Sequence, residues 1–132
     1  MLPFPLMGNS RRVAVVTGGA GAIGGAIAAA LAAAGHTVVS LDQAADPPVD
    51  LASDEQVRAA AADVLGRHGR CDVLVHAAAA FDRAGLADLD LTAWRRVQAV
   101  NVEAALLLAQ AFVPGMAERG FGRIVFIVSD TV

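Results

Sequence analysis

The sequence contains no lysine and no tyrosine, and all ten of its basic residues are arginine. The absence of lysine excludes a Walker-type phosphate loop, which requires one. Cys71 is the only cysteine, so no disulfide can form within the chain. One cysteine and three scattered histidines lack metal-ligand spacing, so we predict no metal site. The net charge of −3 offers no basic excess for nucleic acid, which we exclude as a partner.

Charged residues are also scarce, at 17%, whereas hydrophobic residues make up 56% of the 132 residues. This balance excludes a disordered chain, and the length suits a single domain. The apolar stretches at residues 22–34 and 104–113 are both shorter than the roughly 20 residues of a membrane span. Residues 1–8 lack the basic start of a signal peptide. We therefore expect a cytoplasmic protein with no membrane partner, a flexible leader over residues 1–10 and one domain over residues 11–132.

Short β-branched runs alternate with helix-forming runs along the chain. They predict strands at residues 12–17, 37–41, 71–77 and 123–129, with a further short strand near residues 49–51. Helices are predicted over residues 26–34, 53–65 and 91–118, the last with bends near Asn101 and at Pro114. Such alternation predicts an α/β fold with a Rossmann-like, doubly wound parallel sheet of five strands in the order 3-2-1-4-5.

A glycine-rich segment, TGGAGAIG, spans residues 17–24 between the first predicted strand and the first predicted helix. A helix N-terminus offers unpaired N–H groups to a pyrophosphate, and glycines allow the backbone to approach it closely. We therefore predict that this loop binds a dinucleotide. The residues assigned to that contact are Gly18, Gly19, Ala20, Gly21, Ala22, Ile23 and Gly24. The alternative is a tight turn that binds no ligand.

Asp42 ends the second predicted strand, eighteen residues after Gly24. In this topology a carboxylate at that position accepts hydrogen bonds from the adenosine ribose and repels a 2′-phosphate. No arginine occupies the loop or directly follows Asp42, so NAD is favoured over NADP. The alternative is a strand-end aspartate that caps a turn.

These features and four later motifs resemble the short-chain dehydrogenase/reductase family over about residues 12–130. The loop fits the family's TGxxx[AG]xG pattern, and Asp50 with Leu51 resembles its adenine-contacting pair. Residues 72–79, DVLVHAAA, resemble the DVLVNNAG strand, which places Ala77, Ala78 and Ala79 at the cofactor. Trp94 followed by Val100, Asn101 and Val102 resembles the helix with the active-site asparagine. Residues 122–129, GRIVFIVS, resemble the strand that ends in the catalytic serine, here Ser129.

The resemblance implies an NAD-dependent oxidoreductase that transfers a hydride between its cofactor and a small alcohol or carbonyl substrate. Ser129 would polarise the substrate oxygen, and Asn101 would hold a water in the proton relay. The family's YxxxK motif, which follows the serine, has no counterpart here, since tyrosine and lysine are absent. We therefore expect a fragment truncated before that motif, inactive alone and incomplete at the C-terminal side of its sheet. The alternatives are a non-catalytic NAD-binding or partner-docking module and a truncated product without stable function.

The sequence also departs from the family pattern. His76 replaces an asparagine, and we interpret it as a half-buried structural histidine placed well before the end of its strand, not as a base. No Gly-x-Ser-x-Gly elbow surrounds Ser129, which argues against hydrolase chemistry. We expect Arg95 and Arg96 to be solvated. The family's helices on this side of the sheet also form subunit contacts, so the resemblance implies a homo-oligomer for a complete protein.

Overall fold

The computed structural model describes residues 10–129, with a parallel sheet at its centre. Its strands are β1 (Val13–Thr17), β2 (Thr37–Leu41), β3 (Val73–His76) and β4 (Arg123–Phe126), in the order β2-β1-β3-β4. All three pairings are parallel, and in register Val15 of β1 lies between Val39 of β2 and Leu74 of β3. Because β1 has neighbours on both sides, all five of its residues are buried. The predicted α/β class and parallel sheet are confirmed.

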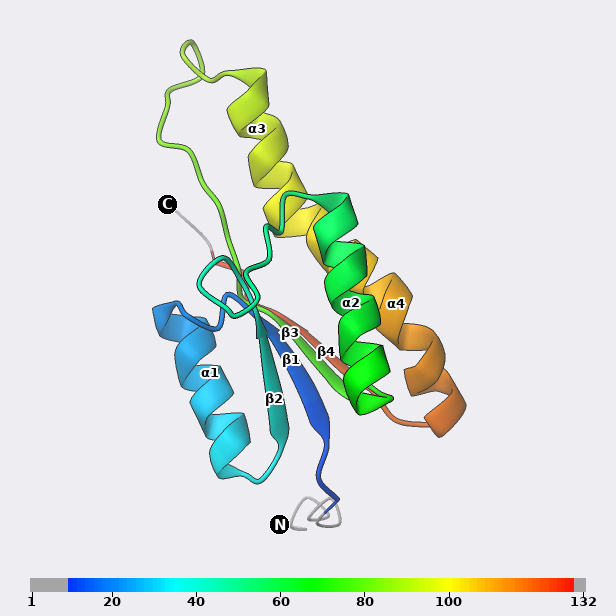
Figure 1. Ribbon diagram of the computed structural model, residues 1–132. Coiled ribbons are helices and arrows are strands. Elements are labelled where there is room, and N and C mark those ends of the chain that lie inside the picture. Colours follow the sequence, from blue (N-terminus) through cyan, green and yellow to red (C-terminus); the bar gives the residue numbers. More distant parts are fainter. Residues whose placement is uncertain (1–9, 130–132) are drawn as a thin grey trace, which may run out of the picture.

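Helices cover the sheet from both sides, as Figure 1 shows. α1 (Ala22–Ala33) lies on one face, and α2 (Asp54–His68) packs with α4 (Ala104–Arg119) on the other. The hydrophobic core fills the space between the sheet and the α2–α4 pair. Its fully buried members include Val15, Val57, Val64, Leu74, Leu108 and Phe112.

Local signals explain where α2 begins and ends. The Ser53 hydroxyl accepts a hydrogen bond from the Gln56 N–H, which caps the first turn. Gly69 ends the helix in the left-handed conformation, at a φ of 70°. The helix therefore continues beyond its predicted end at residue 65 and passes through Gly66. α1 also differs from the prediction, since it begins four residues earlier, at Ala22.

The prediction of a third strand near residues 49–51 is wrong. Within residues 10–129 the sheet has four strands. Val49 and Leu51 are buried, but their segment does not pair with β2. The Val49 N–H donates instead to the Asp42 carbonyl, and the Asp50 N–H donates to the Gln56 side chain. These donors are therefore used in a turn and a loop, so they cannot join a ladder.

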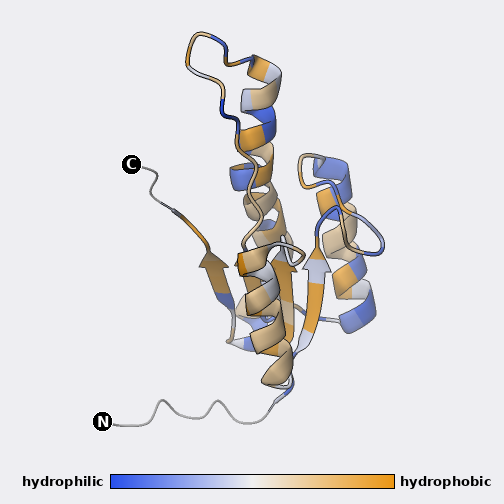
Figure 2. Cartoon of the chain, turned by 90° about the vertical axis from the view of Figure 1, so that its left-hand side faces the viewer, coloured by the Kyte–Doolittle hydropathy of each residue, from blue (hydrophilic) through white to orange (hydrophobic). Residues whose placement is uncertain are grey.

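β4 forms an edge of the sheet and exposes apolar side chains. Val125 is 42% exposed and Phe126 is 53% exposed. Figure 2 shows this strand in the orange of hydrophobic residues at the side of the sheet. An uncovered apolar edge agrees with the prediction that the sheet is incomplete on its C-terminal side.

One long helical run follows the loop after β3. It consists of α3 (Leu91–Gln98), a π-helical turn η1 (Ala99–Glu103) and α4, and the turn lies where a bend was predicted, at Asn101. By length and composition alone, Leu91–Arg119 is a helix that could cross a membrane, which the shorter apolar stretches of the sequence had not indicated. Its second half packs on α2 and β3 through buried side chains such as Leu108 and Phe112, as a core helix does.

Candidate functional site

A cleft of about 610 Å³ lies at the carboxyl ends of the strands. Its walls come from the glycine loop, the segment after β2, the segment after β3 and the helical run. Twelve of the thirteen residues predicted to bind a cofactor line it, and Gly19 does not. The lining residues are Gly18, Ala20–Gly24, Asp42–Ala44, Val49–Leu51, Ala77–Ala80, Arg96 and Val100. The fold thus gathers the predicted residues in one place, and their binding of a cofactor stays a prediction.

Glycines in the loop permit contacts that no side chain would allow. Gly18 has a φ of +69°, and a Cβ there would lie 2.8 Å from the Ala78 Cα. A Cβ on Gly24 would overlap the Gly18 carbonyl oxygen, and one on Gly19 would overlap the Ser40 hydroxyl. Gly19 therefore serves the packing of the loop on β2, which explains its absence from the cleft wall.

Asp42 fixes the glycine loop from the end of β2. One carboxylate oxygen accepts the Ala20 N–H at 2.8 Å, and the other accepts the Ala44 N–H at 2.8 Å. The side chain therefore caps backbone turns, which is the alternative that the sequence left open. It also lines the cleft, so its charge faces any ligand there.

The N-terminus of α1 opens on the cleft without a side-chain cap. Its N-cap residue, Gly21, has no side chain to offer, whereas Ser53 caps α2 and Asp90 caps α3. The first N–H groups of a helix have no intrahelical acceptor, and the helix dipole makes that end positive. A glycine-lined, uncapped helix end fits an anionic group such as a pyrophosphate.

His76 anchors the segment after β3 to its surroundings. Its Nε2 lies 3.0 Å from the Val100 carbonyl oxygen, which can only accept, so Nε2 carries the proton. Nδ1 therefore accepts the Thr17 hydroxyl at 2.9 Å, and that hydroxyl accepts the Ala78 N–H at 3.1 Å. Burial lowers the pKa of His76, against the opposing effect of hydrogen bonds to Val100 and Asn101.

The structural interpretation of His76 agrees with these contacts, with two corrections. The ring is buried, at 4% exposure, and not half-buried. His76 is also the last residue of β3, although it was predicted to lie well before the strand end. The strand is shorter than expected because the backbone after His76 turns toward Thr17 and the glycine loop.

The two predicted catalytic residues lie outside the cleft wall. The Asn101 carboxamide accepts the Ala80 N–H at 2.7 Å and donates to the Ala80 carbonyl at 2.9 Å. It thereby holds the segment of residues 77–80 that forms one wall. Ser129 is exposed beyond the end of β4. Among the described residues, Asn101 and Ser129 form no hydrogen bond with each other.

Arg96 is the charged residue of the cleft that the sequence analysis did not assign to it. It is exposed to solvent, as expected, and its Nη2 also lies 3.5 Å from the Asp50 carboxylate at the cleft wall. The pKa of Asp50 is lowered, mainly by the hydrogen bond from the Ala52 N–H and also by the Arg96 charge. A signal for Arg96 existed, because it lies one helical turn before Val100 and so shares its side of the helix.

A family model and the curated relatives agree in what they indicate. The family model described as short chain dehydrogenase matches residues 47–132. D-threitol dehydrogenase of Mycolicibacterium smegmatis is 33% identical over 90% of this chain and 53% of its own length. The 2-keto-3-deoxy-L-fuconate dehydrogenase of Xanthomonas campestris is 34% identical over 89% of this chain and 42% of its own length.

Solved structures agree with these relatives. A short-chain dehydrogenase from Streptomyces avermitilis superimposes with a TM-score of 0.83 at 34% identity, over 93% of this chain and 51% of that one. A metagenomic short-chain oxidoreductase, solved in complex with NADP, has a TM-score of 0.77 at 32% identity over 92% of this chain and 63% of that one. The chain thus spans about half the length of the curated relatives it matches.

Proposed function

The chain belongs to the short-chain dehydrogenase family, and we propose that it carries the NAD site of an oxidoreductase that interconverts an alcohol and a carbonyl compound. One observation supports this most strongly. The uncapped N-terminus of α1 and the glycine loop, held by Asp42, form a wall of the cleft. When bound there, a nicotinamide ring supplies the hydride acceptor or donor. The proposal includes one domain over residues 11–132 in a cytoplasmic protein.

Each wall of the cleft has a role in this proposal. The loop and the first turn of α1 hold the pyrophosphate through backbone N–H groups. Asp42 accepts from the ribose hydroxyls and disfavours a 2′-phosphate, which is the basis for NAD over NADP. Asp50 and Leu51 contact the adenine. The NADP in a structural relative makes this preference a point for direct measurement.

The proposed substrate is a small alcohol or carbonyl compound. Ser129 would donate a hydrogen bond to the reacting oxygen, and Asn101 would hold a water while it retains the segment at residues 77–80. No residue among the 132 is a tyrosine or lysine that could transfer the proton. The second candidate is a chain that binds NAD or docks to a partner without chemistry of its own. For both candidates we propose that the protein associates with a second copy of itself. We propose no nucleic-acid or membrane partner.

Calorimetric titration of the folded chain with NAD and NADP tests the proposal. Gly24→Ala is the informative variant, because its Cβ would displace the Gly18 carbonyl beside the cleft. We expect this variant to bind NAD at least about tenfold more weakly. Gly66→Ala is the matched control, since a Cβ there meets no atom within 4 Å and Gly66 does not line the cleft. A folded wild-type chain without NAD binding, or equal binding by Gly24→Ala, would refute the site.

Asp42→Asn tests the cofactor preference separately. It keeps an acceptor for one of the two backbone N–H groups, loses the acceptor for the other, and removes the negative charge. We expect the ratio of NADP to NAD affinity to rise in this variant. An unchanged ratio would contradict the role of Asp42 without affecting the assignment of the cleft.

A further inference from the structure

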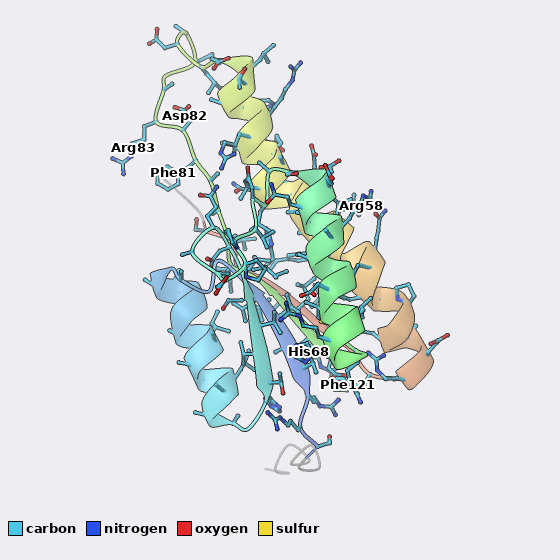
Figure 3. All side chains as sticks on the ribbon, in the orientation of Figure 1. Arg58, His68, Phe81, Asp82, Arg83 and Phe121 are labelled. Atoms are coloured by element: carbon cyan, nitrogen blue, oxygen red, sulfur yellow. The ribbon has the colours of Figure 1, made fainter. Side chains whose placement is uncertain are left out.

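A second cavity, of about 430 Å³, lies at the opposite end of the sheet from the cleft, where the strands begin. Arg11, Arg12, Arg123 and His36 all line it, together with Phe121, and its described lining includes no Asp or Glu. Figure 3 shows Phe121 at this end, near the start of β1 and away from the loop with Phe81. The concentration of positive charge is distinctive because the chain as a whole has a net charge of −3.

Phe121 brings two guanidinium groups together. The Arg12 guanidinium carbon lies 3.4 Å from the ring centroid, and that of Arg123 lies 4.7 Å from the same centroid. The two carbons are therefore at most about 8 Å apart, and like charges at this separation repel. Neither guanidinium forms an ion pair within residues 10–129.

The groups around the cavity do not neutralise the positive charge of Arg12 and Arg123. Asp72, a carboxylate at the same end of the sheet, is fully buried and is held by Arg70 and Arg119. The C-terminal end of α1 also lines the cavity, and free carbonyls there would repel an anion. The carbonyls of Ala30, Leu31 and Ala32 are, however, already engaged by the N–H groups of residues 34, 36 and 35.

We propose that this cavity binds a small ligand through a dianionic phosphate group. The contact with the Phe121 ring restricts the position of the Arg12 guanidinium, and a guanidinium can make a bidentate contact with phosphate. Arg123 supplies a second charge at the same ring. His36 Nδ1 accepts the backbone N–H of Arg12 at 3.3 Å, so a neutral imidazole presents an Nε2–H donor. The volume falls within the roughly 300–1,000 Å³ of small-molecule sites, which favours a phosphate monoester.

Titration of the ¹⁵N-labelled chain with inorganic phosphate and with glycerol phosphate, at constant ionic strength, tests the proposal by NMR. We expect saturable shifts of the amides of Arg12, Gly35, Phe121 and Arg123. Shifts at residues 18–24 would report separately on phosphate in the dinucleotide cleft. Stronger binding of the ester identifies a phosphorylated metabolite, and equal binding identifies free phosphate as the ligand.

Variants distinguish a built site from general charge attraction. Arg12→Gln and Arg123→Gln should each weaken binding about tenfold or more. Arg95→Gln, which removes an exposed arginine on α3, should leave it unchanged. Arg12→Lys keeps the charge without the fork and should give an intermediate affinity, which also provides a test if Arg12→Gln does not fold. Unsaturable shifts, shifts confined to residues 18–24, or equal affinities for all variants would overturn the proposal.

Discussion

Acidification should destabilise this protein through its buried histidine, His76. The ring nitrogens are both engaged, with Nε2 donating to the Val100 carbonyl and Nδ1 accepting from Thr17. A second proton on Nδ1 would replace the acceptor that Thr17 needs and would place a charge where the ring is 4% exposed. Burial accordingly lowers the pKa of His76 below its ordinary value of 6.5.

The sign and size of the effect follow from proton linkage. Below pH 6.5 the unfolded chain binds a proton at His76 that the folded chain excludes, so stability falls as the pH falls. The slope for one proton cannot exceed about 1.4 kcal/mol per pH unit, so the loss between pH 7.5 and 5.5 is at most about 1.4 kcal/mol. Carboxylates titrate near pH 4 and contribute little in this window.

Urea denaturation followed by circular dichroism at several pH values measures the effect. His76→Asn should be about 1–3 kcal/mol less stable at pH 7.5, because Thr17 or Val100 loses a partner. The gap to wild type should narrow at pH 5.5, by at most about 1.4 kcal/mol, since the variant has no histidine at this position to protonate. His68→Gln, at an exposed position on α2, should keep the wild-type slope. A gap that stays constant with pH would refute the reasoning.

Two further predictions concern the amino end of β3. Asp72→Asn should lower the free energy of unfolding by about 3 kcal/mol at pH 7, because it removes the buried partner of Arg70 and the Val13 N–H. Burial raises the pKa of Asp72, but these partners and Arg119 lower it further, so its contribution should disappear as the pH falls below 3.8. A urea-unfolding gap that does not shrink as the pH falls below 3.8 would contradict this. Burial raises the pKa of Cys71 to about 12, so iodoacetamide should modify it only on unfolding. Equal rates of modification with and without guanidinium chloride would show that the Cys71 thiol is accessible in the folded protein.

The elements that sequence patterns predicted well are those with strong local signals. The β-branched runs around Val15, Val39 and Leu74 became paired strands, and those of β1 and β3 are largely buried. The start of α1 was missed because Gly24 and Gly25 disfavour a helix by propensity. Packing reverses that preference, since a side chain at Gly24 would collide with the Gly18 carbonyl.

Contacts between distant segments were beyond local patterns. The pair of Arg96 and Asp50 depends on the path of the chain between β2 and α2, and no periodicity records that path. The same segment caused the error at the third strand, since Val49 bonds to Asp42 and not to a neighbouring strand. Pro47 and Pro48 argue against a strand in this segment, because proline has no backbone N–H to donate to a β-ladder.

The charged side chains of the cleft link its predicted cofactor preference to the conformation of the glycine loop. Much of its wall is glycine and alanine, so Asp42, Asp50 and Arg96 are the charged groups that line it within residues 10–129. Asp50 and Arg96 face each other, and Asp42 already accepts two backbone N–H groups. A neutral, non-accepting residue at position 42 would weaken the repulsion of a 2′-phosphate and would also release Ala20 from its partner. The predicted preference for NAD and the conformation of the glycine loop therefore depend on the same carboxylate.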